Sequence, residues 1–143
     1  MKKILLLLAL SASFAACKKS GGSCSLSAAA MVGDWKLTAI NYKATPTSAE
    51  VNIFNDDSWY NACDRDNIFR FRADNTYSFV DTGIVCSGGG DGYDDGAWQL
   101  IGNAILWDGY QDTVSSFSCN SMTISEHDYD VATDVAKYVF TRK

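Results

Sequence analysis

The chain has 143 residues, 47% of them hydrophobic and 20% charged, which suits one folded domain and excludes an intrinsically disordered protein. Its formal charge is −5 and its Lys and Arg residues form no cluster, so nucleic acid, which needs a basic surface, is excluded as a partner. Aromatic residues reach 13%, and fifteen of the seventeen acidic residues are Asp. This composition, with eleven Gly and a single Pro, favours strands joined by tight turns.

The first sixteen residues have the order of a secretory signal peptide. Lys occupies the second and third positions, an unbroken apolar run follows over 4–10, and small residues are frequent over 11–16. The apolar and small residues together number 13, whereas a helix needs about 20 to span a bilayer, so a membrane-spanning helix is disfavoured. We therefore predict a signal peptide over 1–16, whose removal leaves 127 residues with a net charge of −7.

The end of this segment resembles a bacterial lipobox, in which small residues precede a Cys that becomes the acylated N-terminus. It reads Phe14-Ala15-Ala16-Cys17, with Phe14 where an aliphatic residue is usual, and an ordinary signal-peptidase cut after Ala15 is the alternative. We predict that Cys17 carries a palmitate-type lipid anchor and that residues 17–30 form a lipidated N-terminus and flexible tether. Because Lys residues, and not the acidic residues of a surface-export tag, follow Cys17, we expect an envelope protein in the outer membrane that faces the periplasm.

Four cysteines remain if Cys17 is lipidated, and an even number in an exported protein predicts disulfides. Three pairings of four cysteines are possible. We favour Cys63–Cys86, which closes a local loop around one hairpin, and Cys24–Cys119, which ties the tether to the folded domain.

A single helical turn is expected over residues 27–32, with Ser27 as its cap, and alternation with a period of two begins at Trp35. The last strand places Tyr138, Phe140 and Arg142 on one face. Further strands are expected over 35–42, 51–54, 113–118, 122–125 and 136–142.

Aromatic residues fix the register of one hairpin. Four aromatic side chains share a face only if Phe71 lies opposite Tyr77 and Phe69 lies opposite Phe79. This pairing leaves a three-residue loop over 73–75, in which Asn75 can adopt the left-handed conformation.

A second hairpin follows the same logic with a shorter turn. A two-residue turn at 102–103 pairs Trp98 with Trp107 and Leu100 with Ile105 on one side. With eight to ten short strands and no alternation of strand and helix, the chain reads as an antiparallel sandwich or barrel.

The tripeptide Gly33-Asp34-Trp35 at the start of the first strand is similar to the Gly-x-Trp signature of lipocalins, and it has an echo at Gly96-Ala97-Trp98. The resemblance to small bacterial lipocalin-like lipoproteins extends over residues 63–77, Cys86, 96–100 and 138–142. It implies an all-β, antiparallel up-and-down barrel over 31–143, preceded by a short N-terminal helical turn, and no enzymatic activity. An Arg of the last strand packs across the signature Trp in lipocalins, so Gly33, Trp35 and Arg142 are expected to close the barrel.

The sequence offers little for catalysis or metal binding. His127, the one His, lies between Glu126 and Asp128 in a polar stretch and is interpreted as a solvated residue rather than a general base. No Cys-x-x-Cys pair is present to hold zinc, and no nucleophile motif occurs, so we predict no catalytic residue, no cofactor and no metal. The Gly- and Asp-rich segment 88–96 is interpreted as a solvated loop, with calcium binding as the alternative.

Inward-facing aromatic residues leave two functions open. They can line a pocket for a small apolar or amphiphilic ligand, or they can fill the barrel and leave its loops to contact an envelope protein or glycan. Trp59-Tyr60 is expected in a loop at the mouth of the barrel. The membrane is the expected partner through the lipid, and no protein partner is identified. The ligand-binding candidates are Phe69, Phe71, Tyr77, Phe79, Trp98, Trp107 and Phe140.

Overall fold

A computed structural model describes residues 24–84 and 93–143 of the chain. Several predictions lie outside these residues: the signal peptide 1–16, the first part of the tether with Cys17, the proposed disulfide partner Cys86, and most of the loop 88–96.

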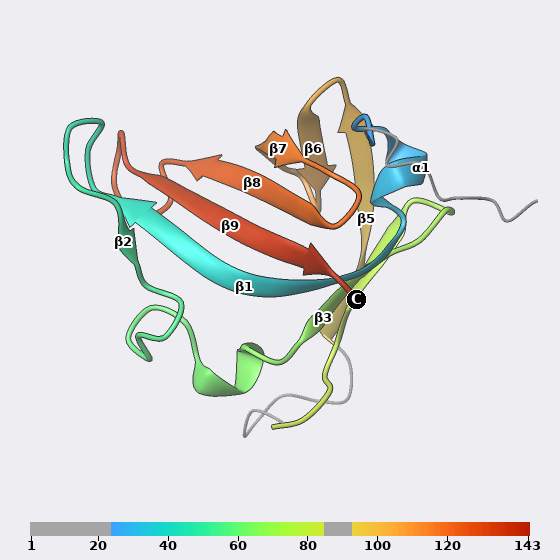
Figure 1. Cartoon of the computed structure of the whole chain (residues 1–143), viewed down its shortest axis with the longest axis horizontal. Helices are drawn as coiled ribbons and strands as arrows, with labels where there is room; N and C mark the ends of the chain where they lie inside the picture. Colours follow the sequence, from blue (N-terminus) through green and yellow to red (C-terminus); the bar gives the residue numbers. More distant parts are fainter. Residues whose placement is uncertain (1–23, 85–92) are drawn as a thin grey trace, which may run out of the picture.

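The described residues form two short helices and nine strands. A helical turn and a first long strand are followed by a series of hairpins (Figure 1). In chain order the elements are helix α1 (Ala28–Met31), strands β1 (Gly33–Lys43) and β2 (Val51–Asn52), the 3-10 helix η1 (Ala62–Asp64), and strands β3 (Ile68–Phe71), β4 (Thr76–Val80), β5 (Tyr93–Ile101), β6 (Ala104–Trp107), β7 (Tyr110–Phe117), β8 (Ser121–His127) and β9 (Val135–Arg142).

Eight of these strands close into a barrel. From β3 to β9 every strand pairs antiparallel with the next, and β1 pairs with both β3 and β9. The first and last strands therefore lie side by side over most of their length, as Figure 1 shows, from Trp35 opposite Arg142 to Lys43 opposite Val135. The short strand β2 continues the pairing of β1 beyond β3. The predicted all-β, up-and-down antiparallel barrel is confirmed.

Both predicted hairpin registers are confirmed. Phe71 lies opposite Tyr77 and Phe69 opposite Phe79, and Asn75 in the connecting loop has a φ of 65°. In the second hairpin Trp98 lies opposite Trp107 and Leu100 opposite Ile105. Side-chain alternation fixed these registers because a slip of one residue would turn each aromatic set out to solvent.

The strand expected over 51–54 is shorter in the structure and ends at Asn52. The side-chain Oδ1 of Asn52 accepts a hydrogen bond from the Phe54 amide at 3.0 Å, and the Asp56 amide donates to the Ile53 carbonyl at 3.1 Å. These local bonds turn the chain away from β1, because an Asn side chain competes with the strand for backbone donors.

The last part of the predicted tether, residues 24–30, lies among the described residues. The Cys24–Cys119 disulfide is confirmed, with the two Cα atoms 5.1 Å apart, and Leu26 packs against the buried core. Ser27 accepts a hydrogen bond from the Ala30 amide at 3.2 Å and caps α1. Residues 24–30 are therefore held against the barrel, because the disulfide and an apolar contact fix them at two points.

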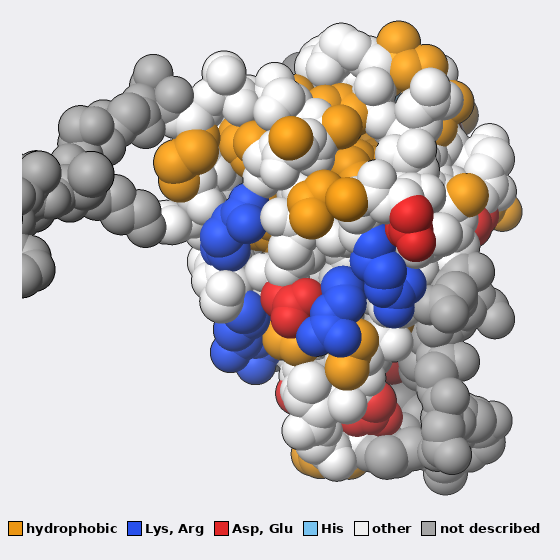
Figure 2. Space-filling model, turned by 90° about the vertical axis from the view of Figure 1, so that its right-hand side faces the viewer, with side chains coloured by type: hydrophobic (Ala, Val, Ile, Leu, Met, Phe, Trp, Pro, Cys, Tyr) orange, Lys and Arg blue, Asp and Glu red, His pale blue; other side chains and the backbone are white. Residues whose placement is uncertain are grey.

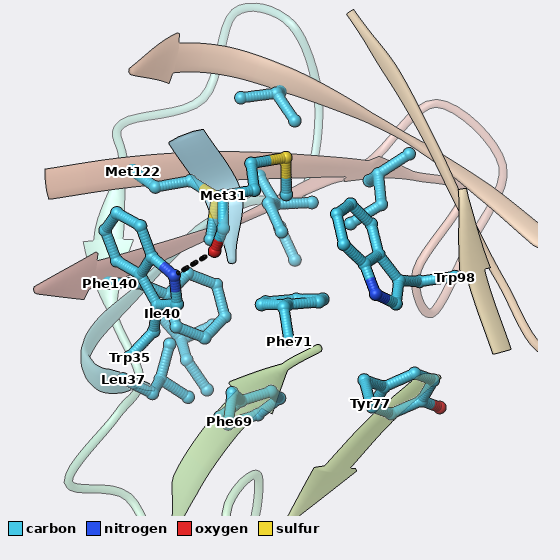
Figure 3. Close-up of a cluster of buried hydrophobic side chains, with 14 of the residues drawn as sticks. Met31, Trp35, Leu37, Ile40, Phe69, Phe71, Tyr77, Trp98, Met122 and Phe140 are labelled. Atoms are coloured by element: carbon cyan, nitrogen blue, oxygen red, sulfur yellow. Dashed lines mark hydrogen bonds between the residues drawn. The ribbon is translucent and has the colours of Figure 1, made fainter. Parts of the chain in front are cut away.

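The barrel has two unlike ends, and β1 and β9 run from one end to the other. The closed end carries α1, the turns at 72–75, 102–103 and 118–120, and the C-terminus. The open end carries the loops at 44–67, 108–109 and 128–134. Fully buried apolar side chains at the closed end include Met31, Trp35, Phe71, Ile105 and Met122 (Figure 3), while Ile40, Ile124 and Ala136 are buried farther along the barrel.

Charged side chains stay on the outside of the closed end. Figure 2, which views the molecule from the side of α1 and the C-terminus, shows acidic side chains lying among the basic ones. Arg70 and Asp34, on adjacent strands β3 and β1, form a two-pronged ion pair there with N–O distances of 2.7 and 2.8 Å. The hydrogen bond from Arg70 lowers the pKa of the Asp34 carboxyl below its ordinary value.

Candidate ligand-binding cavity

Trp35 lies at the centre of the closed end. Its side chain is 0% exposed, and its indole Nε1 donates a hydrogen bond to the Met31 carbonyl at 2.8 Å, the bond drawn in Figure 3. That carbonyl belongs to the last residue of α1, so the indole fills the core and also satisfies the end of the helix.

Arg142 covers Trp35 and joins three segments of the chain. Its guanidinium carbon lies 4.4 Å from the centre of the Trp35 ring. Its Nε donates to the Cys119 carbonyl at 2.8 Å, its Nη1 donates to the Val32 carbonyl at 3.1 Å, and its Nη2 donates to the Ala30 carbonyl. The guanidinium thus ties the last strand to the helical turn and to the turn between β7 and β8.

Gly33 is required by both its backbone and its surroundings. Its φ is +137°, a conformation that other residues rarely adopt, and a Cβ atom there would lie 2.8 Å from Nη1 of Arg142. The Gly-x-Trp pattern therefore has a physical explanation here: Gly makes room for the guanidinium, and Trp two residues later enters the core.

A cavity of about 390 Å³ occupies the open half of the barrel. This volume lies in the usual range for small-molecule pockets, roughly 300–1,000 Å³. Its walls come from β1, β3, β4, β6, β7, β8 and β9 and from the segment before β3; they comprise Leu37, Tyr60, Asp64, Asn67, Phe69, Phe79, Trp107, Tyr110, Asp112, Glu126, Tyr138 and Phe140.

The seven aromatic candidates divide between the two halves of the barrel. Four of them line the cavity: Phe69, Phe79, Trp107 and Phe140. The other three pack below it, where Phe71 lies 5.1 Å from Trp98 and 6.2 Å from Tyr77 between ring centres. The barrel is therefore filled toward its closed end and hollow toward its open end.

Trp59 and Tyr60 both lie at the open end. Tyr60 lines the cavity, and Trp59 packs outside it against Tyr42 and Tyr129, with ring centres 5.1 and 6.2 Å apart. Trp59 remains 36% exposed, so this aromatic group is accessible from solvent.

Asp112 is a buried carboxyl in the cavity wall. It is 8% exposed, and its Oδ2 accepts a hydrogen bond from Nε1 of Trp107 at 2.7 Å. Burial raises the pKa of Asp112 above its ordinary value, because an apolar surrounding disfavours the charged form; the Trp107 hydrogen bond and the nearby His127 oppose this in part.

Further polar groups of the wall form hydrogen bonds with one another. Glu126 accepts a hydrogen bond from the Tyr138 hydroxyl at 2.6 Å. Burial is the main cause that raises the pKa of Tyr138, and the acidic neighbour Glu126 adds to this effect. Asn67 is 5% exposed and donates from Nδ2 to Asp64 at 3.4 Å, while no donor among the described residues reaches its Oδ1. Such an acceptor is costly to bury unpaired.

The polar part of the cavity wall was not predicted, although the sequence contains a pattern that indicates it. Asp112 stands two residues before Val114, and Glu126 stands two residues after Ile124; both apolar residues are buried in the barrel. Because side chains of a strand alternate between faces, the same period that placed the apolar residues inward also places these two acids inward.

The remaining candidate residues do not line the cavity. His127 is exposed at the end of β8, and Cys63 is disulfide-bonded, while its predicted partner Cys86 lies outside the described residues. Within 24–84 and 93–143, no three His, Cys, Asp or Glu side chains converge as metal ligands would. Nor does the described part of the chain contain a helix with the length and apolar character to cross a membrane.

An eight-stranded barrel with a cavity at one end is a binding fold of the lipocalin type. A family model described as a lipocalin-like domain matches residues 31–125, and the chain belongs to this family. The family is generally a non-enzymatic binding fold. No curated protein and no solved structure matches the chain.

Proposed function

We propose that this protein is a lipid-anchored envelope lipoprotein whose barrel binds a small apolar or amphiphilic molecule. The observation that carries the proposal is the cavity of about 390 Å³. Its walls are largely aromatic and aliphatic, its size suits a small molecule, and its place at the open end lets a ligand enter between the loops. At the other end, Trp35 is fully buried and the guanidinium of Arg142 covers its ring.

The packing of the rest of the barrel supports a ligand over a purely structural role. The closed half already provides the buried apolar cluster that the fold needs, including Trp35, Phe71 and Ile105. Phe79 and Trp107 are instead only partly buried where they border the cavity, and a ligand that covers them removes apolar surface from water.

Native mass spectrometry of the protein purified from its own envelope tests this function. We expect a non-covalent adduct of small-molecule mass that is lost when the protein is denatured. The extracted molecule, added back to stripped protein, should change the fluorescence of Trp107 in the cavity wall. The change should disappear in Trp107→Phe and persist in Trp59→Phe, whose indole lies outside the cavity. Protein that carries no adduct and binds nothing from the extract would contradict the proposal.

A second function is favoured by the aromatic group at the open end. Tyr42, Trp59 and Tyr129 form a partly exposed cluster of the kind that contacts sugars or proteins. An interaction lipoprotein that acts through this cluster should lose its envelope cross-links in Trp59→Ala and keep them in Trp107→Phe. The reverse result would favour the ligand carrier.

The lipid anchor is the other part of the proposal. The support is the N-terminal sequence pattern that ends at Cys17, together with the Cys24–Cys119 disulfide, since disulfides persist in oxidising compartments outside the cytoplasm. Cys17→Ser should move the protein from the detergent phase to the soluble fraction, because the acyl chains provide the membrane affinity. Partition into detergent that survives this substitution would refute the anchor.

A further inference from the structure

The charged side chains of the cavity wall all have the same sign. Among its twelve described lining residues, Asp64, Asp112 and Glu126 are acidic, and none is Lys, Arg or His. We propose that the cavity selects a small organic cation, a protonated amine on an aromatic or aliphatic body. This inference rests on the proposed ligand-binding function and names the chemical class of the ligand.

The two most informative acids have no Lys or Arg partner among the described residues, and the exposed His127 is the positive neighbour that favours the charged form of Asp112. Asp112 and Glu126 accept hydrogen bonds from the neutral donors Trp107 and Tyr138. Neither takes part in the ion pairs of the described residues, which join Arg65 to Asp57, Arg70 to Asp34 and Lys137 to Glu50. A carboxylate held in an apolar wall is costly unless a positive charge compensates it, and a cationic ligand would supply that charge.

The register of the sheet places these two acids opposite each other. Thr113 and Ser125 are paired across β7 and β8, and Asp112 and Glu126 are the next residues along each strand. Like charges opposite each other on neighbouring strands are destabilising. A cation between them replaces this repulsion with two attractive interactions.

The aromatic wall and an unpaired acceptor favour the same class of ligand. Phe69, Phe79, Trp107 and Phe140 border the cavity, and aromatic rings attract cations at their faces. Oδ1 of Asn67, 95% buried in the wall, has no donor among the described residues, and an ammonium group carries up to three N–H donors.

Other small ligands fit these observations less well. A metal ion needs several ligands within one coordination sphere, and no such convergent group of three exists among the described residues. A fatty acid would bring a carboxylate into a wall that already contains three carboxyl groups. An amine with an apolar body satisfies both the acids and the rings.

Three probes of one shape and different charge test the inference at pH 7 by isothermal titration of the purified lipoprotein. They are 2-phenylethylamine (positive), 2-phenylethanol (neutral) and 3-phenylpropanoate (negative). We expect the amine to bind at least about tenfold more tightly than the alcohol, and the acid to bind most weakly. Equal or tighter binding of the alcohol or the acid overturns the inference and leaves the proposed function standing. Binding of none of the three also overturns it, and the adduct found by native mass spectrometry then decides the proposed function separately.

Two cavity variants and a matched control test whether the acids of the cavity wall cause the preference for the amine. Glu126→Gln and Asp112→Asn each remove one negative charge but keep an acceptor for Tyr138 or Trp107, so each should reduce the preference for the amine by about tenfold. Glu50→Gln changes the only other Glu of the chain, which pairs with Lys137 outside the cavity, and should leave the preference unchanged. Unaltered binding of 2-phenylethanol shows that each variant retains its cavity. A preference that survives in both cavity variants, or that falls equally in Glu50→Gln, contradicts the assignment.

Discussion

The closed and open ends of this barrel are formed by the same strands but differ in how their buried polar groups are bonded. At the closed end, Trp35 is fully buried, and its indole nitrogen and the three donors of Arg142 that we describe all meet backbone carbonyls. At the open end, Asp112 and Glu126 accept hydrogen bonds only from the neutral donors Trp107 and Tyr138, and Oδ1 of Asn67 has no donor among the described residues. The first arrangement stabilises the fold, and the second is suited to a ligand.

This difference indicates which end of a small barrel is the binding site. Large aromatic side chains occur at both ends, so aromatic content does not separate a core from a binding site. The distinction comes from polar groups: those at the closed end are satisfied within the chain, whereas Asp112 and Asn67 are buried beside empty space.

The largest effect on the free energy of unfolding should come from substitution of Trp35, with Trp59 at the open end as the comparison. Trp35→Ala should lower the free energy of unfolding by about 3–5 kcal/mol, because it removes a fully buried indole and leaves a cavity. Trp59→Ala, at the open end and 36% exposed, should lower it by only about 1 kcal/mol. Chemical denaturation followed by circular dichroism measures both values. Equal losses would mean that the two ends contribute alike to stability.

The disulfide should have the next largest effect, because it holds the N-terminal segment to the closed end. Cys24 and Cys119 are 95 residues apart, so replacing both with Ala should lower the free energy of unfolding by about 2–4 kcal/mol. Binding of a ligand at the open end should remain unchanged in this variant. A loss of binding would show that the two ends are coupled.

A smaller effect is expected between Arg142 and Trp35. Because the guanidinium lies over the indole, the losses caused by Trp35→Phe and Arg142→Ala should not add. The double variant should fall short of the sum by about 0.5–2 kcal/mol. Denaturation of the four proteins completes the cycle, and strict additivity would mean that the ring contact contributes no stability.

The smallest effect is expected in the pH dependence of folding stability, to which two carboxyl groups contribute with opposite sign. The folded-state pKa of Asp112 is raised by burial, so the folded protein binds its proton more tightly, and its contribution to stability falls as pH rises from the ordinary Asp pKa through that raised value. The folded-state pKa of Asp34 is lowered by Arg70, so its contribution is present above the ordinary Asp pKa and is lost as pH falls through the lowered value.

Measured relative to wild type, Asp112→Asn should therefore gain stability between pH 4 and pH 7, by less than about 1 kcal/mol. Asp34→Asn should lose stability when the pH is raised from the acid range to 7. Thermal melts across this range provide the measurement. Two differences of the same sign would contradict the contrast between an unpaired acid at the open end and a paired acid at the closed end.

Much of the fold could be predicted because local pattern determines it. Alternation of aromatic residues fixed the pairing of Phe71 with Tyr77, and the two-residue turn at 102–103 fixed that of Trp98 with Trp107. The helix cap at Ser27 has a local signature as well. The end of β2 was harder to predict, because the side chain of Asn52 competes with the strand for a backbone donor.

The sequence by itself determined the antiparallel hairpins, since a period of two and turn residues act over short distances along the chain, and its resemblance to lipocalins indicated the closed barrel and the place of Arg142 over Trp35. Only the tertiary structure decided which part of the barrel is hollow. Phe71 and Phe69 stand two residues apart on one strand, yet one is enclosed by Trp98 and Tyr77 and the other borders the cavity. Asp112 and Glu126 likewise become neighbours only when β7 pairs with β8. Whether space is filled depends on the side chains that all the strands contribute at one level of the barrel, and closure alone brings these together.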